Sequence, residues 1–150
     1  MTYMERMQAI VEEYRAFGEP WPGTARQIAE WAMGRGLWSP RRDLADLCAD
    51  DIATAMREEF ITDPQGRTVR AKHASRIKRD GTQPRMVWAD IRTADRQHME
   101  IAFQERRQQI VNDCRQLKTD LDSYNDNGNP GRPLQLVLDF TYDVEELMAA

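Results

Sequence analysis

The chain has 150 residues and a formal net charge of −4, a size that suits one domain with its own hydrophobic core. A hydrophobic fraction of 41% and four tryptophans argue against a disordered chain. No apolar run approaches the length of a membrane span, and the N-terminal residues lack the apolar core of a signal peptide. We therefore expect a cytoplasmic protein without membrane partners, most naturally a bacterial one.

Charge is distributed unevenly along the chain. Residues 67–85 hold seven basic residues and one acid, a local charge of +6 that leaves −10 for the remainder. A basic island on an acidic protein is a local feature, and its best physical interpretation is contact with an anion such as nucleic-acid phosphate.

Three helices are predicted before this island. Residues 3–17 repeat apolar side chains at spacings of three and four, which is typical of an amphipathic helix. Thr24 and Gln27 have the spacing of a capping box at the start of a second helix. A third helix is expected over residues 40–59, with proline in its first turn. Its expected inner stripe consists of Leu44, Leu47, Cys48, Ile52, Ala55 and Met56. We expect Cys48 and Cys114 to be free, buried thiols.

The basic island predicts a β-hairpin. Residues 60–62 form a brief strand, and the order Asp63-Pro64-Gln65-Gly66 is typical of a type I turn. Over residues 67–78, basic side chains alternate with small or apolar ones, which predicts a single strand with one basic face. An Asp-Gly pair marks the tip at 79–84, and the return strand at 85–91 places Trp88 beside the basic row. Cations with a neighbouring aromatic ring suit contact with phosphates.

Three helices followed by a hairpin resemble the winged-helix domain, a helix-turn-helix variant in which a β-wing follows the recognition helix. The resemblance covers residues 3–91 and lies in the order of elements and the placement of turns. It implies that residues 40–59 enter the major groove and that residues 67–91 contact the DNA backbone or minor groove. The candidate contacts are the basic residues of the wing and of the start of the third helix: Arg41, Arg42, Arg67, Arg70, Lys72, Arg76, Lys78, Arg79 and Arg85.

The third helix departs from the family pattern because it is acidic. Asp43, Asp46 and Asp50 share one face, where phosphates would repel them. Three interpretations stay open: the wing alone holds DNA with help from Arg41 and Arg42, the domain binds protein instead, or the basic strand is a solvated face whose charges prevent edge-to-edge pairing.

A long helix is predicted from a Thr93 cap to Tyr124. A heptad seam with one polar break runs along it: Phe103, Arg107, Ile110, Cys114, Leu117, Leu121 and Tyr124. About 30 residues span roughly 45 Å, which is more than the first helix can cover. The seam packs inside the monomer or pairs with a second copy; we favour a homodimer, which would place two wings on one duplex.

The C-terminal part, residues 128–150, contains a turn-rich loop, an alternating segment and a short acidic tail helix over 142–150. Alternating leucines over residues 134–140 predict a short C-terminal strand. The order Gln-Leu-Val-Leu-Asp-Phe at 135–140 also resembles the Gln-Leu-x-Leu-x-Phe peptide by which bacterial proteins dock on the replication sliding clamp. That resemblance implies that Leu138 and Phe140 enter an apolar pocket while Gln135 forms hydrogen bonds beside it.

The sequence does not predict an enzyme. His73 is expected on the inward face of the basic strand, and His98 on the exposed surface of the long helix. We find no ligand spacing for zinc and no phosphate-binding glycine loop, so neither a metal nor a cofactor is expected. Asp90 and Glu100 flank a strand-to-helix junction, as Mg²⁺ ligands of nucleases do, but no further residue completes the set.

The sequence therefore predicts an α+β protein with a winged-helix-like domain over residues 1–92 and a long helix over 93–127 for packing or dimerisation. The expected function is non-enzymatic DNA binding through the basic wing, in regulation or in the upkeep of a mobile element. The alternative is a protein-interaction module that uses the acidic helix, the long helix or residues 135–140 without binding nucleic acid.

Overall fold

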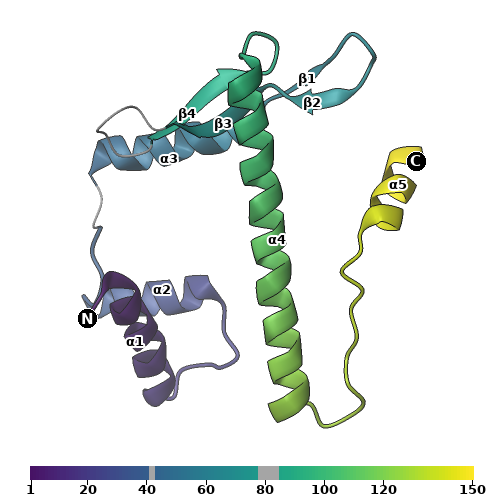
Figure 1. The fold of residues 1–150 in the computed structure, drawn as a ribbon. Helices are drawn as coiled ribbons and strands as arrows, with labels where there is room; N and C mark the ends of the chain where they lie inside the picture. Colours follow the sequence, from purple (N-terminus) through teal and green to yellow (C-terminus); the bar gives the residue numbers. More distant parts are fainter. Residues whose placement is uncertain (41–42, 78–84) are drawn as a thin grey trace. The chain divides into compact units, whose positions relative to one another are not determined.

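The structure is a computed structural model that describes residues 1–40, 43–77 and 85–150 (Figure 1). The described residues form a mixed α+β fold with five helices and two antiparallel hairpins. Two compact units are present, Met1–Ile52 and Ala53–Ala150. Among the described helices, none has the combination of length and apolar character needed to cross a membrane.

The first unit contains α1 (Tyr3–Ala16) and α2 (Ala25–Gly34), which pack on each other. The predicted capping box of α2 is confirmed: Thr24 accepts a hydrogen bond from the Gln27 backbone, and the Gln27 side chain accepts one from Thr24. Tyr14 is buried at the centre of the unit, where its hydroxyl donates to the Pro20 carbonyl at 2.8 Å. Its ring meets Trp31 edge to face, with centroids 5.5 Å apart.

Helix α3 (Leu44–Arg57) begins later than residue 40. Asp43 stands before it and accepts a hydrogen bond from the Asp46 backbone at 2.9 Å, which fixes the start of the helix. The expectation of a buried inner stripe is wrong for Leu44, Leu47 and Ile52, whose side chains are exposed. Both cysteines are free as expected, but Cys48 is exposed and Cys114 only half-buried. The spacing of apolar residues sets their face of the helix, whereas burial depends on a neighbouring surface.

The first hairpin pairs β1 (Phe60–Thr62) with β2 (Thr68–Arg70), and Ile61 lies opposite Val69. Its turn follows the predicted order, because the Gly66 N–H donates to the Asp63 carbonyl at 2.9 Å. Gly66 has a φ of 84°, a conformation that disfavours other residues.

The second hairpin pairs β3 (Lys72–Ile77) with β4 (Arg85–Asp90), with Lys72 opposite Asp90 and Ala74 opposite Trp88. The prediction of one strand over residues 67–78 is wrong, because the chain passes from the first hairpin to the second at Ala71. This fully buried residue donates its N–H to the Glu59 carbonyl at 2.9 Å and accepts at its own carbonyl from Ile91 N–H at 2.8 Å. The backbone of Ala71 therefore forms hydrogen bonds next to both hairpins. The predicted tip at residues 79–84 lies outside the described residues.

Helix α4 (Arg96–Asn127) packs on β3 and extends beyond the predicted end at Tyr124 (Figure 1). Its N-cap is Asp95 rather than Thr93, because the Asp95 carboxylate accepts the His98 N–H at 2.8 Å. A carboxylate at this position also interacts favourably with the helix dipole.

After α4 the chain forms a loop, an extended segment and α5 (Thr141–Ala149), which confirms the short tail helix. The predicted C-terminal strand is wrong, since residues 133–140 belong to neither described sheet. The Asn125 side chain donates to the Leu134 carbonyl and accepts from the Leu134 N–H, at 2.8 and 2.9 Å. These bonds occupy backbone groups that a strand partner would need.

The α2 capping box gives a test of the first unit. Thr24→Ala should lower its stability by about 1 kcal/mol, because the N–H of Gln27 loses its acceptor. Thr24→Ser keeps a hydroxyl and should lose much less. Urea denaturation followed by tryptophan fluorescence measures both, and equal losses in the two variants would contradict the capping role.

Candidate nucleic-acid interface

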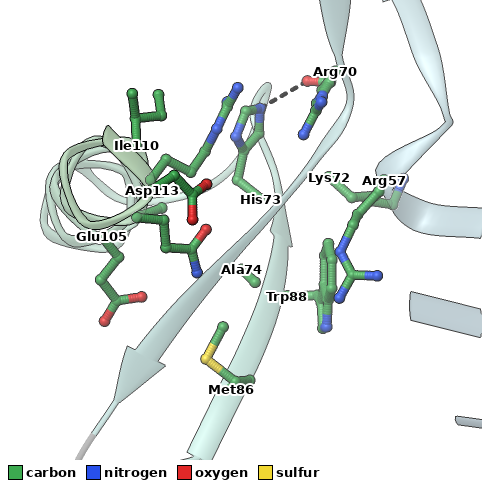
Figure 2. A pocket seen from close by; sticks show the side chains of 13 residues that line it. Arg57, Arg70, Lys72, His73, Ala74, Met86, Trp88, Glu105, Ile110 and Asp113 are labelled. Atoms are coloured by element: carbon green, nitrogen blue, oxygen red, sulfur yellow. Dashed lines mark hydrogen bonds between the residues drawn. The ribbon is translucent and has the colours of Figure 1, made fainter. Parts of the chain in front are cut away.

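The β3–β4 hairpin has one face against α4 and one face away from it, and we call the second the outer face. It consists of Lys72, Ala74 and Arg76 from β3 and Met86, Trp88 and Asp90 from β4. Figure 2 shows the helix on one side of the strands and Trp88, with Arg57, on the other. The predicted alternation is confirmed, because His73 and Ser75 on the opposite face are buried.

Two buried histidines, one on each element, lie between the inner face of the hairpin and α4. The expectation of an exposed His98 is wrong: its side chain is 6% exposed, and Nε2 donates to the His73 carbonyl at 2.8 Å. His73 is 5% exposed, and its Nε2 donates to the Arg70 carbonyl at 2.8 Å (Figure 2). Ala102, one helical turn after His98, is fully buried and lets the helix approach the strand closely. That four-residue spacing is the signal by which the sequence marks the buried face of α4.

Burial lowers the pKa of His73, with a further contribution from Arg106, while the hydrogen bond to Arg70 acts in the opposite direction. The imidazole is therefore neutral at neutral pH. In this state it donates one N–H to a carbonyl and holds the strand in place without adding a charge.

Some of the predicted cations are paired within the fold. The Arg67 guanidinium donates to the Asp63 carboxylate at 2.7 Å. Lys72 contacts Glu59 at 2.9 Å and Asp90 at 3.3 Å, and these hydrogen bonds raise its pKa. Hydrogen bonds from Arg92, and then from Lys72, hold the pKa of Asp90 far below its usual range. Arg67 and Lys72 thus stabilise the fold locally, and Asp90 is engaged by cations.

Other predicted cations have no such partner. Arg70, Arg76 and Arg85 are exposed, and within the described ranges none of them forms an ion pair with an acidic side chain. Arg41, Arg42, Lys78 and Arg79 lie outside the described residues.

Two further cations were missed from the sequence. Arg57 of α3 places its guanidinium 5.7 Å from the centre of the half-buried Trp88 ring. Arg106 of α4 joins Arg57 and Arg70 in lining a cavity of about 350 Å³ beside β3 (Figure 2). No local signal distinguishes Arg57, which lies in an acidic helix, so only the tertiary structure reveals it.

The cavity has walls from both faces of the hairpin. His73 and the α4 residues Glu105 and Arg106 line one side, and Ala74 and Trp88 line the other. A cavity that touches both faces must pass around an edge of the sheet. Glu105 lines the cavity and accepts the Arg76 N–H at the edge of β3 that β4 leaves uncovered, so the cavity lies along this edge, and we call it the edge groove.

The predicted partner-binding residues lie in the extended segment before α5. Gln135 is exposed, Phe140 is 40% exposed and Leu138 is half-buried. The Asp139 carboxylate accepts the Thr141 N–H at 3.1 Å, which lowers the pKa of Asp139. Among the described residues, no hydrogen bond or ion pair joins Gln135, Leu138 or Phe140 to the hairpin.

Metal ligands do not gather at this site. The described part of the chain contains no cluster of three or more His, Cys, Asp or Glu side chains placed to hold a metal ion. Comparison of the chain with protein-family models, curated proteins and solved structures found no match. The chemistry of the basic hairpin is therefore the basis for inferring function.

The burial of His73 predicts a dependence of stability on pH. Its folded-state pKa lies below the ordinary value of 6.5, so the unfolded chain binds a proton that the folded chain does not. The stability that this residue contributes is present above that value and declines as pH falls below it. Urea midpoints at about pH 7.5 and 5.5 should differ more for the native chain than for His73→Asn. An equal change in the two proteins would contradict the assignment.

Proposed function

We propose that the protein binds nucleic acid, duplex DNA first of all, without catalysing a reaction, through the basic residues of the hairpin region. The observation that carries this proposal is the exposed, unpaired state of Arg70, Arg76 and Arg85 within the described residues. The chain has 25 acidic residues against 21 basic ones, so acids to neutralise these three were available. Free cations on an acidic protein suit phosphate binding.

The arrangement of these cations supports contact with several phosphates. Arg70 ends β2 of the first hairpin, whereas Arg76 lies in β3 and Arg85 in β4 of the second. Cations from two hairpins can meet different phosphates, which recur about every 3.4 Å along one strand of duplex DNA. Trp88, with Arg57 over its ring, offers an aromatic surface next to them.

Under this proposal the hairpin is the wing of a winged-helix-like protein, and α3 has the position of the recognition helix. Asp43, Asp46 and Asp50 make α3 a poor phosphate ligand, so the wing supplies the affinity. We place the protein in the bacterial cytoplasm, in a regulatory or mobile-element-associated role.

Pairing of α4 with a second copy belongs to the same proposal. Ile110, Leu117 and Tyr124 of the predicted seam are 57%, 44% and 47% exposed. Apolar side chains at heptad spacing suit a coiled-coil partner. A dimer would present two basic hairpins to one duplex and strengthen binding without new types of contact.

The first test reverses the free cations. Arg70→Glu/Arg76→Glu/Arg85→Glu should lose measurable binding to a random-sequence duplex of about 20 base pairs in fluorescence polarisation. Native binding should weaken as salt rises, by a log–log slope of about 0.9 for each phosphate contacted.

The matched control reverses three exposed arginines elsewhere on the chain, Arg96→Glu/Arg115→Glu/Arg132→Glu. It carries the same change in net charge and should keep most of the affinity. Equal losses in the two triple variants would mean that only net charge matters. Absence of native binding at low salt would refute the proposal.

A second candidate function is docking of residues 135–140 on a bacterial sliding clamp. The observation that favours it is their extended, unpaired and largely exposed backbone segment. A docking peptide needs such accessibility, because its partner must surround Leu138 and Phe140.

Substitutions within the segment test this candidate. Leu138→Ala and Phe140→Ala should each weaken binding of the full chain to a purified bacterial sliding clamp by tenfold or more, since each removes a buried apolar anchor. Val137→Ala is the control, because Val137 is 80% exposed and is not a fixed position of the peptide. Surface plasmon resonance gives the three affinities, and an equal effect of all three substitutions would count against docking.

A further inference from the structure

The edge of β3 opposite β4 is available for another strand. The second hairpin has two strands only within the described residues, so β3 has a neighbour on one side. The Ala71 carbonyl accepts from Ile91 N–H, so the alternation of a strand directs the backbone groups of His73 and Ser75 toward β4 as well. Lys72, Ala74 and Arg76 then direct theirs to the open edge.

A side chain already occupies one of these edge groups. The Arg76 N–H donates to both oxygens of the Glu105 carboxylate, each at 3.2 Å. Two long contacts from one donor give modest stabilisation, and a main-chain carbonyl could replace the carboxylate. An exposed strand edge of this kind is a template for pairing with an extended peptide.

The walls of the edge groove differ in chemistry. On the outer-face side, Met86 and Trp88 offer apolar surface. On the α4 side, Glu105, Arg106, Gln109 and Asp113 offer polar groups. Lys72 is paired with Glu59 and Asp90, and the remaining cations Arg57, Arg70 and Arg106 outnumber the acids Glu105 and Asp113. The groove therefore suits an acidic peptide with leucines on one side and polar residues on the other.

Residues 134–140 of this chain have that pattern. Leu134, Leu136, Leu138 and Phe140 alternate with Gln135, Val137 and Asp139. Leu134 and Leu136 are 55% and 52% exposed, and the segment has no strand partner among the described residues. Residues 133–150 hold four acids and no lysine or arginine, which complements the cations of the groove.

The length of α4 decides between the same chain and a second copy. Glu105 lies 22 residues before the end of the helix at Asn127, which corresponds to about 33 Å. A chain that turns at Gly131 and returns fully extended needs roughly ten residues to cover that distance. It would come level with Glu105 only at about residue 141, so within one chain the leucine-rich segment reaches the Asp113 end of the groove but not the Arg76 N–H that Glu105 binds.

We propose that the edge groove binds residues 135–140 of a second copy of this chain as a strand added to β3. Leu136 and Leu138 pack on Met86 and Trp88, while Gln135 and Asp139 face Gln109 and Arg106. A carbonyl of the added strand accepts the hydrogen bond from the Arg76 N–H in place of the Glu105 carboxylate. This inference does not depend on nucleic-acid binding.

Disulfide trapping between two variants tests the contact. In a Cys48→Ser/Cys114→Ser background, Ala74→Cys protein is mixed with Leu136→Cys protein under mild oxidation. Cross-strand neighbours have Cβ atoms close enough for a disulfide, so a linked dimer should form and appear in non-reducing electrophoresis. Mixing Ala74→Cys with Met148→Cys is the control, because Met148 is 79% exposed but outside the segment.

Proline substitutions separate strand pairing from random collision. Val137→Pro and Leu138→Pro, each added to the Leu136→Cys chain, remove successive backbone N–H groups, and one of the two faces β3. That one should lower the yield of linked dimer about tenfold. Circular dichroism confirms that each variant is folded.

Three outcomes would overturn the proposal. One is no linked dimer in the mixture above the Met148→Cys control. Another is an unchanged yield with both prolines. The last is an internally linked monomer from the double variant Ala74→Cys/Leu136→Cys without linked dimers in the mixture, which would assign the groove to the tail of the same chain.

Discussion

The backbone of Ala71 is the constraint on which the basic region depends. Its N–H donates to the Glu59 carbonyl and its carbonyl accepts the Ile91 N–H, so one buried residue connects the residue before β1 with the residue after β4. The consequence is that a basic run continuous in sequence is divided between two hairpins: Arg67 and Arg70 belong to the first, and Lys72 and Arg76 to the second.

Local signals predicted the capping box at Thr24, the turn at Asp63–Gly66 and the alternation around His73, although they placed the N-cap of α4 at Thr93 rather than Asp95. The larger errors fall where a distant partner decides. The break at Ala71 needs Glu59 and Ile91, and the burial of His98 needs the His73 carbonyl. The alternation of leucines in residues 134–140 indicates an extended segment, but it carries no information about whether a partner strand lies beside it.

The candidate site shows the same division. Counting charges located the basic hairpin but gave no information about which cations the fold neutralises. Asp63 pairs with Arg67 four residues along the turn, whereas Glu59 pairs with Lys72 from another element. Arg57 lies among the acidic residues of α3, and only its contact with Trp88 shows that it belongs to the site. Pairing of side chains across elements is a tertiary property, so a sequence can indicate a charged surface without indicating its free charges.

Helix α4 is long, and only one end of it is packed against the hairpin. Its 32 residues form a rod of about 48 Å, and only its first turns hold buried side chains, His98 and Ala102. A rod fastened at one end transmits orientation along its whole length, since an α-helix bends only gently. The hairpin and the C-terminal segment are therefore joined by a stiff helix rather than by a flexible linker.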